Sequence, residues 1–200
     1  MLVKDMCLRK NSFIYFIAIF IFFFQKNVFA NESLNEKAFK YLNDLKFFSA
    51  SFIQDDKSSI SQGRIYIGKE RIRIEYETPT KILIILDENK AMYFNYELDE
   101  DEFFNPRDTS ASIFFEIFNN IEFFSNSMIV SEDSYLIFEK SGESDIGNYK
   151  VRVFFENNPV LIRKIELFAD DLYLTLSIFD HNYNERFDKN FFKLINPSFF

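Results

Sequence analysis

The fold of this chain is decided by residues 60–98, ISQGRIYIGKERIRIEYETPTKILIILDENKAMYFNYEL. Within this stretch, Arg71–Glu77 alternates apolar and charged residues with a period of two. Successive side chains of a strand point to opposite faces, so Ile72, Ile74 and Tyr76 share one face and the charged residues share the other. The pattern predicts a half-buried antiparallel strand. Three further strands are expected beside it, near 60–67, 81–87 and 90–97.

Strands are also expected outside this stretch. They lie at Phe48–Asp56 and near 127–131, 134–139, 149–155, 160–168 and 171–179, with a last short strand at Phe191–Ile195. The acidic run Glu97–Glu102 is interpreted as a solvated turn, because it lacks the ligand spacing of a calcium-binding loop. About eleven successive antiparallel strands make a sheet too long and twisted to stay flat. We therefore expect one mainly β domain that curls into a barrel or deep half-barrel.

Two segments have the spacing of amphipathic helices. In Asn31–Lys46, Ser33 and Glu36 form a capping-box pattern at the start of an apolar stripe. In Asp108–Asn120, a second apolar stripe follows a cap that Asp108 or the next Thr or Ser can supply. Short helices need an apolar surface to lie on, so both are expected on the concave face of the sheet. A barrel of this strand number is wider than side chains fill, which predicts a ligand cavity.

The first thirty residues are typical of a secretory signal peptide. A basic start, Met1–Asn11, precedes the unbroken apolar run Phe13–Phe24, and the region closes with Val-Phe-Ala at Ala30. An uncleaved transmembrane anchor is the alternative, but Lys26 and Asn27 interrupt the apolar run before the ~20 residues that a membrane span needs. We therefore expect a signal peptide at 1–30, cleavage after Ala30 and an exported domain at 31–200.

The expected mature chain is acidic and contains no cysteine. The single cysteine, Cys7, lies before the apolar run, so it cannot be the lipidated cysteine of a lipoprotein. Removing residues 1–30 takes away four basic residues and one acid, which lowers the net charge from −8 to −11. A chain this acidic, without a basic stripe, is a poor candidate for binding nucleic acid or an anionic membrane surface. The full sequence has 29 phenylalanines, and some of those outside residues 1–30 could line a cavity.

The sequence contains no convincing enzyme motif. His181 is the only histidine, and it falls in a polar loop without the further His or Cys residues that a metal site or a catalytic triad would use. A hydrolase that depends on His181 is kept as a hypothesis. Acidic pairs such as Asp55-Asp56 fall in predicted turns, although paired carboxylates for sugar chemistry stay open. With four glycines, the chain offers no phosphate-binding loop. We predict a protein that is not an enzyme and uses no cofactor or metal ion.

Several short motifs follow one another along the expected mature chain. Phe-x-Ala-x-Phe-x-Gln at 48–54 comes after the first helix, Gly63-Arg64 opens the next strand, and Arg-Ile-Arg-Ile-Glu-Tyr-x-x-Pro occupies 71–79. In the C-terminal half, Asn158-Pro159 leads into Ile162–Ile165, and Phe191–Pro197 comes near the end. In this order the motifs resemble the LolA family of periplasmic outer-membrane lipoprotein carrier proteins.

The resemblance implies a fold and a function. The fold is an unclosed antiparallel β-barrel whose short helices form a lid over an apolar cavity. Such carriers are taken to bind the acyl chains of lipoproteins that an ATP-driven transporter releases from the inner membrane. The carriers deliver the lipoproteins across the periplasm to an outer-membrane acceptor. We expect this chain to be a monomer. The expected cavity residues are Phe48, Phe52, Ile72, Ile74, Tyr76, Met92 and Phe94, and the expected lid residues are Leu42, Leu45, Ile113 and Ile117.

One segment departs from the family pattern. The family usually has an Arg-Pro pair before the strand equivalent to 71–77, and that arginine hydrogen-bonds the lid closed. Here the segment reads Gly68-Lys69-Glu70-Arg71, so Lys69 is the nearest match for the latch, and Arg71 or Arg64 could substitute. Lysine lacks the planar multi-donor fork of arginine. The alternative function is a periplasmic sensor or adaptor of the same fold that binds lipids or lipoproteins without transporting them.

Overall fold

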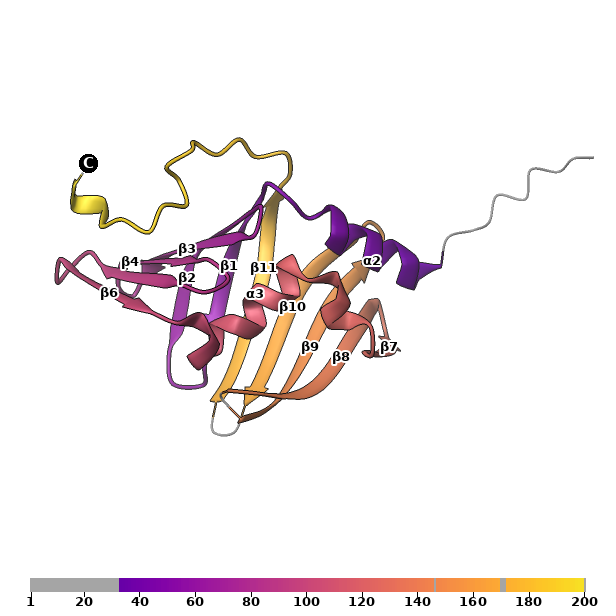
Figure 1. The fold of residues 1–200 in the computed structure, drawn as a ribbon. Coiled ribbons are helices and arrows are strands. Elements are labelled where there is room, and N and C mark those ends of the chain that lie inside the picture. The colour runs from indigo at the N-terminus through magenta and orange to yellow at the C-terminus, as the bar shows by residue number, and fades with distance from the viewer. Residues whose placement is uncertain (1–32, 146, 170–171, 200) are drawn as a thin grey trace, which may run out of the picture. The chain divides into compact units, whose positions relative to one another are not determined.

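The computed structural model describes residues 33–145, 147–169 and 172–199 of the chain. The expected signal peptide lies outside these residues. Eleven strands form one antiparallel sheet in the order β6-β5-β4-β3-β2-β1-β11-β10-β9-β8-β7 (Figure 1). The edge strands β6 and β7 do not pair, so the sheet curls without closing. The predicted unclosed antiparallel β-barrel is therefore confirmed.

The two halves of the sheet are each a run of neighbouring antiparallel strands. The first half consists of β1 (Phe48–Asp55), β2 (Ile60–Gly68), β3 (Arg71–Thr78), β4 (Ile82–Leu86), β5 (Ala91–Asn95) and β6 (Glu100–Phe104). The second half consists of β7 (Met128–Glu132), β8 (Tyr135–Ser144), β9 (Gly147–Asn157), β10 (Val160–Ala169) and β11 (Leu172–Asn182). Pairing of β1 with β11, with Phe52 opposite Ile178, joins the halves into one sheet.

The helices cover the concave face of this sheet. Helix α2 (Leu34–Asp44) follows its N-cap residue Ser33, where the predicted capping box with Glu36 is present, and it packs against β10. The link between the edge strands β6 and β7 contains η1 (Pro106–Asp108), α3 (Ala111–Asn119) and η2 (Ile121–Phe124). Because this link runs from one edge to the other, it carries α3 across the face (Figure 1). Buried residues of α2 and α3 form one core with apolar residues of both halves of the sheet.

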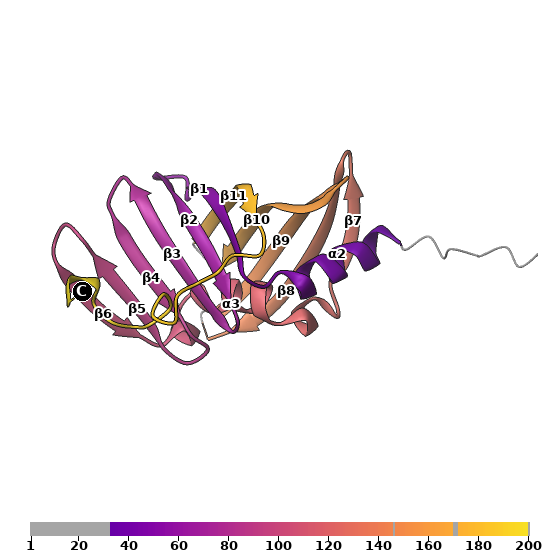
Figure 2. The same cartoon turned by 90° about the horizontal axis from the view of Figure 1, so that it is seen from above.

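The convex face of the first half is covered by the C-terminal segment, residues 183–199. In Figure 2 this segment runs across β1–β5, and it ends in η3 (Pro197–Phe199). The backbone N–H of Glu185 donates to the carbonyl of Phe47 at 2.7 Å, which fixes the start of the segment. Near its end, Leu194 packs on a second, smaller core on this face, formed by Leu83, Ile85, Met92 and Phe94.

Two local predictions are wrong. Residues Phe191–Ile195 form turns rather than a strand, because they lie across the strands and pair with none of them. Conversely, part of the acidic run predicted as a turn is β6, in which Glu100 pairs with Asn95. Only residues 96–99 form the turn. The three acidic residues of β6 are exposed on an edge strand, where charge is tolerated and opposes pairing with another chain.

Candidate functional site

An apolar cavity of ≈ 340 Å³ lies between the concave face of the sheet and the start of α3. Side chains of six strands form its wall, and the N-terminal half of α3 forms its roof, with Ala111 and Phe114 facing the strands. Most of the remaining lining is aliphatic or aromatic: Phe52, Ile65, Ile74, Tyr76, Ile84, Leu86, Phe104, Leu172, Leu174 and Leu176. The size falls at the lower end of the range of about 300–1,000 Å³ that is usual for ligand sites.

The strand registers explain why these side chains converge. Ile74 on β3 lies opposite Ile65 on β2 and Ile84 on β4, so the three side chains form one row across the face. A second row contains Tyr76, opposite Gly63 on β2, which in turn lies opposite Phe52 on β1. Because Gly63 has no side chain, the rings of Phe52 and Tyr76 meet above it with centroids 5.2 Å apart. The cavity wall is therefore a direct product of the period-two pattern.

A small number of polar groups interrupts the apolar lining. The hydroxyl of Tyr76 donates to Oε1 of Gln54 at 2.8 Å, which satisfies both groups within the wall. Burial raises the pKa of Tyr76 to about 12. Asp56, Thr109 and Ser110 complete the polar part of the lining. An apolar cavity with few polar groups suits a hydrocarbon ligand and offers no acid–base pair for catalysis.

The structure brings together some of the predicted cavity residues. Phe52, Ile74 and Tyr76 line the cavity. Phe48 and Ile72 share the same face but are fully buried in the packed core beside it. The alternation of β3 put Ile72 on the correct face, but it could not tell that close packing begins at this residue.

Met92 and Phe94 lie on the opposite face of the sheet, and this placement corrects the prediction that they line the cavity. Both belong to the small convex-face core, packed with Leu83 and Ile85 under the C-terminal segment. Strands β4 and β5 are apolar on both faces, so their sequence contains no sign of which face is inside. On β4, the cavity instead receives Ile84 and Leu86.

The predicted lid residues are buried but do not roof the cavity. Leu42 of α2, Leu45 directly after α2, and Ile113 and Ile117 of α3 are all within the main core. The roof consists of Ala111 and Phe114, which sequence analysis missed. Phe114 stood next to the predicted stripe, but the rotation of a short helix about its axis depends on what it packs against.

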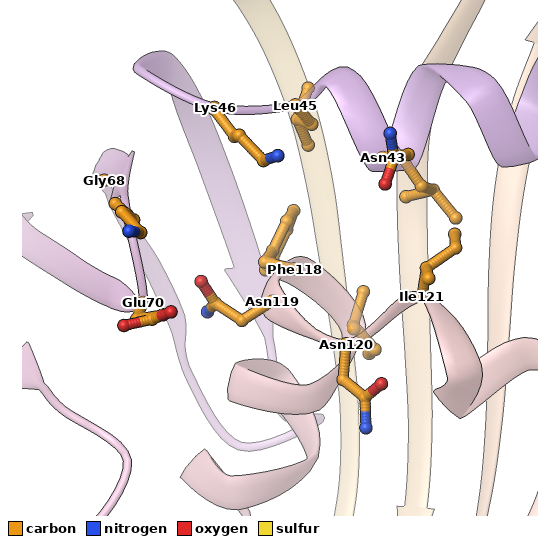
Figure 3. Close-up of a pocket in the computed structure, with 12 residues that line it drawn as sticks. Asn43, Leu45, Lys46, Gly68, Glu70, Phe118, Asn119, Asn120 and Ile121 are labelled. Carbon is orange, nitrogen blue, oxygen red and sulfur yellow. The ribbon is translucent and has the colours of Figure 1, made fainter.

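A second pocket, of ≈ 210 Å³, opens where both helices end near the turn between β2 and β3. Figure 3 shows Lys46 reaching into the space between the two helices and this turn, with Asn119 directed toward Glu70. Lys69, the first candidate for the latch, also lines this pocket. The other two candidates point elsewhere: Arg71 pairs with Asp87 at 3.4 Å, and Arg64 donates to Ser49 Oγ at 3.2 Å. The role of Lys69 stays a prediction.

Other kinds of site are not seen in the part of the chain that the structure describes. No group of three or more His, Cys, Asp or Glu side chains within residues 33–145, 147–169 and 172–199 is placed to hold a metal ion. Among the helices of these same residues, none has the length and hydropathy to cross a membrane. His181 contacts aromatic rings and a backbone carbonyl rather than a nucleophile.

The family model described as "Outer membrane lipoprotein carrier protein LolA" matches residues 43–195, which run from the end of α2 to the C-terminal segment. This chain belongs to the LolA family. Members of the family are periplasmic proteins that bind lipoproteins, and they are carriers rather than enzymes. The predicted family resemblance is thus confirmed.

Individual proteins similar to this LolA-family chain are distant from it. The uncharacterized protein RP864 of Rickettsia prowazekii (strain Madrid E) is 24% identical over 181 residues, which cover 86% of this chain and 82% of RP864. A crystal structure of an uncharacterized conserved protein from Thermus thermophilus has a TM-score of 0.48 at 8% identity, covering 78% of this chain and 93% of that one. A chain in the structure of the Pseudomonas aeruginosa MucA/MucB complex has a TM-score of 0.44 at 14% identity. The match covers 77% of this chain and 60% of the matched chain.

Proposed function

We propose that this protein is a periplasmic lipoprotein carrier. It binds the acyl chains of lipoproteins that an ATP-driven transporter releases from the inner membrane, and it delivers them to an outer-membrane acceptor. The apolar cavity under α3 carries this proposal, and membership of the LolA family supports it. Transport as a monomer after removal of residues 1–30 is part of the proposal.

The physical need for such a carrier follows from the hydrophobic effect. Each acyl methylene left in water costs about 0.8 kcal/mol, so a free lipoprotein would aggregate or enter the nearest bilayer. Side chains such as Ile74, Ile84 and Leu174 offer an apolar surface that removes a chain from water. Asp56 and Ser110 give the cavity polar groups that can face the head of the ligand.

Delivery also requires that the ligand can leave. Among the described residues, no side chain of α3 hydrogen-bonds to a strand: Ser112 and Asn119 bond back to backbone carbonyls of Thr109 and Phe115. Apolar contacts hold α3 itself against the strands, and such contacts can be exchanged for contacts with an acyl chain at little net cost. The flanking η1 and η2 are tied by polar contacts, from Arg107 to Asn89 and from Lys140 to the carbonyl of Phe123. The apolar contacts of α3 support it as the part of the lid that moves when a ligand enters.

Binding is tested with a synthetic diacylglyceryl-cysteine lipopeptide and its unacylated peptide as the matched ligand. The acylated peptide should displace an apolar fluorescent dye from the protein, and the unacylated peptide should not. Ile84→Phe should weaken binding because the larger side chain fills the cavity. The control, Met128→Phe, enlarges an exposed side chain on the edge strand β7 that pairs with Glu139 on the face away from the cavity, and it should leave binding unchanged. Equal binding by both variants would place the ligand elsewhere.

Transport is tested separately from binding. A protein loaded with fluorescent lipopeptide is mixed with vesicles that carry an acceptor lipoprotein, and transfer is followed by energy transfer to a membrane dye. A carrier should release its load to these vesicles faster than to vesicles without acceptor. Tight binding without transfer would favour the alternative, a sensor or adaptor module that binds lipoproteins without moving them.

A further inference from the structure

A hydrogen-bonded pair of side chains lies within the apolar cavity under α3. The hydroxyl of Tyr76, on β3, donates to Oε1 of Gln54, on β1, at 2.8 Å. The pair spans the intervening strand β2, where Gly63, opposite Tyr76, has no side chain to separate them. This bond uses the amide oxygen and leaves both N–H groups of Nε2 for another acceptor. Among the described residues, Nε2 has no hydrogen-bond partner.

The other polar groups of the lining are differently placed. The carboxylate of Asp56 accepts hydrogen bonds from two serines of its own turn, and the hydroxyl of Thr109 donates to a carbonyl within η1. The side chain of Ser110 makes no capping bond, but this residue belongs to the roof, directly before α3. Gln54 instead lies on a central strand of the sheet. Its amide is therefore a donor held in place by the cavity wall.

The cavity lining changes from polar to apolar along the strands. Gln54 lies near the end of β1, and Asp56 follows directly after this strand. The row that contains Ile74 and Ile84 crosses β1 at Ala50, four residues earlier. At about 3.3 Å per residue, this row lies roughly 13 Å from Gln54. A ligand with one polar end and long hydrocarbon chains can therefore place its polar end at Gln54 and its chains along the isoleucines.

We propose that Gln54, oriented by Tyr76, binds an ester carbonyl at the head of the lipid group of a lipoprotein. The amide nitrogen donates to the carbonyl oxygen, and the hydrocarbon chains extend toward Ile74 and Ile84. Gln54 is then a specificity-determining residue that distinguishes ester-linked acyl chains from ether-linked alkyl chains. This inference deepens the proposed carrier function and rests on it for the identity of the ligand.

The chemistry of the amide gives the direction of this preference. A bound hydrocarbon chain displaces water from the cavity, so the N–H groups of Gln54 lose their partners unless the ligand supplies an acceptor. An ester carbonyl is a strong acceptor, whereas an ether oxygen is a weaker one. The bond that Tyr76 donates to Oε1 also polarises the amide and strengthens its N–H donors. Ester-linked chains should therefore bind more tightly than ether-linked chains of the same length.

The test compares two synthetic lipopeptides with the same peptide and the same chain length, one with two ester-linked chains and one with two ether-linked chains. Their affinities are measured by displacement of an apolar fluorescent dye. The wild-type protein should bind the diester at least about threefold more tightly, as expected for one net hydrogen bond. Measurable but equal binding of the two would overturn the inference and leave the carrier function standing, whereas binding of neither would overturn both.

A matched pair of variants assigns the preference to Gln54. Gln54→Met removes the donors but keeps an unbranched side chain of similar length, so it should bind the diester no more tightly than the diether. The control is Gln62→Met, the same change on β2, where the exposed side chain lies opposite Ile53 on the other face of the sheet. This control should keep the wild-type preference. An ester preference that persists in Gln54→Met would overturn the proposal.

Infrared spectroscopy of the wild-type complex tests the hydrogen bond without any variant. An ester carbonyl absorbs above the amide band of the protein, and a hydrogen bond lowers its frequency because the C=O bond is weakened. The bound diester should show a band below that of the same ester in a hydrocarbon solvent, and this band should be absent from Gln54→Met. A wild-type band at the hydrocarbon-solvent frequency would overturn the proposal, even if Gln54→Met does not fold.

Discussion

Arg73 donates from Nη1 to the backbone carbonyl of Phe191 at 2.8 Å and thereby fastens the C-terminal segment to the convex face of β3. Its guanidinium also lies over the ring of Phe191, 4.5 Å from the centroid, and pairs with Glu75. Arg73 belongs to the charged face of β3, and the C-terminal segment therefore covers most of its side chain. The contact explains how a sheet with an apolar convex patch at Met92 and Phe94 keeps this patch out of water.

Removing the Arg73 contact should loosen the C-terminal segment. We expect Arg73→Gln to lower the free energy of unfolding by about 2 kcal/mol, because a charge-assisted hydrogen bond and a cation–π contact are lost together. Urea unfolding measures this change. Arg71→Gln is the control: its pair with Asp87 is more exposed, so we expect a loss below about 1 kcal/mol. Similar losses in both variants would contradict the assigned role of Arg73.

Variants on the two apolar faces of the sheet should have different effects on stability and on ligand binding. Phe94→Ala is expected to cost about 3–5 kcal/mol of unfolding free energy, since a fully buried ring is removed from the convex-face core. Lipopeptide affinity of the folded fraction should stay the same, because Phe94 does not line the cavity. Phe114→Ala, in the roof, should instead change the affinity at a smaller cost in stability. Loss of affinity in folded Phe94→Ala would show that the convex face takes part in binding.

The close approach of strands at Gly63 should not tolerate a side chain. A Cβ at this position would lie 2.0 Å from the carbonyl oxygen of Glu75 and 2.9 Å from the ring of Phe52. Gly63→Ala must therefore shift the backbone of β3, and we expect a loss of several kcal/mol by urea unfolding, above the ~1–3 kcal/mol usual for overpacking. At Gly68 a Cβ would meet only the ring of Phe192, which can move, so Gly68→Ala should cost clearly less.

The change in the free energy of unfolding above about pH 10 should reflect the ionisation of Tyr76. Its pKa is raised to about 12 by burial, whereas an unfolded tyrosine ionises near 10. Folding therefore favours the neutral hydroxyl, and this contribution is constant below about pH 10 and lost as the pH rises toward 12. Two pKa units correspond to about 3 kcal/mol.

The matched variant for this effect is Tyr76→Phe. It should lose less stability than the wild type between about pH 10 and 12, measured by urea unfolding at each pH. The same series on Tyr96→Phe, which removes a more exposed tyrosine, should follow the wild type more closely. If the curves of Tyr76→Phe and the wild type are parallel across this range, the hydroxyl of Tyr76 is not shielded in the cavity wall.

Much of the fold followed from local patterns. Alternation in Arg71–Glu77 placed Ile72, Ile74 and Tyr76 on one face of the sheet, because each residue of a strand reverses the direction of the side chain. The capping pattern at Ser33 marked the start of α2, since the bonds that define it join residues only three apart. Strand number was enough to predict an antiparallel sheet that curls into a barrel or deep half-barrel with helices on its concave face. That the barrel is unclosed was implied by the resemblance to the LolA family.

The site depended on contacts between distant segments. Alternation could not say which face of β4 and β5 is inside, because both faces are apolar, and only the C-terminal segment across Met92 and Phe94 decides it. Part of this segment, Phe191–Ile195, was predicted as a short strand, although it lies across the sheet and pairs with no strand. The sequence determined which residues share a face, since this is a local property of the backbone. Only the tertiary structure decided which face holds the cavity, since this depends on segments far apart in the chain.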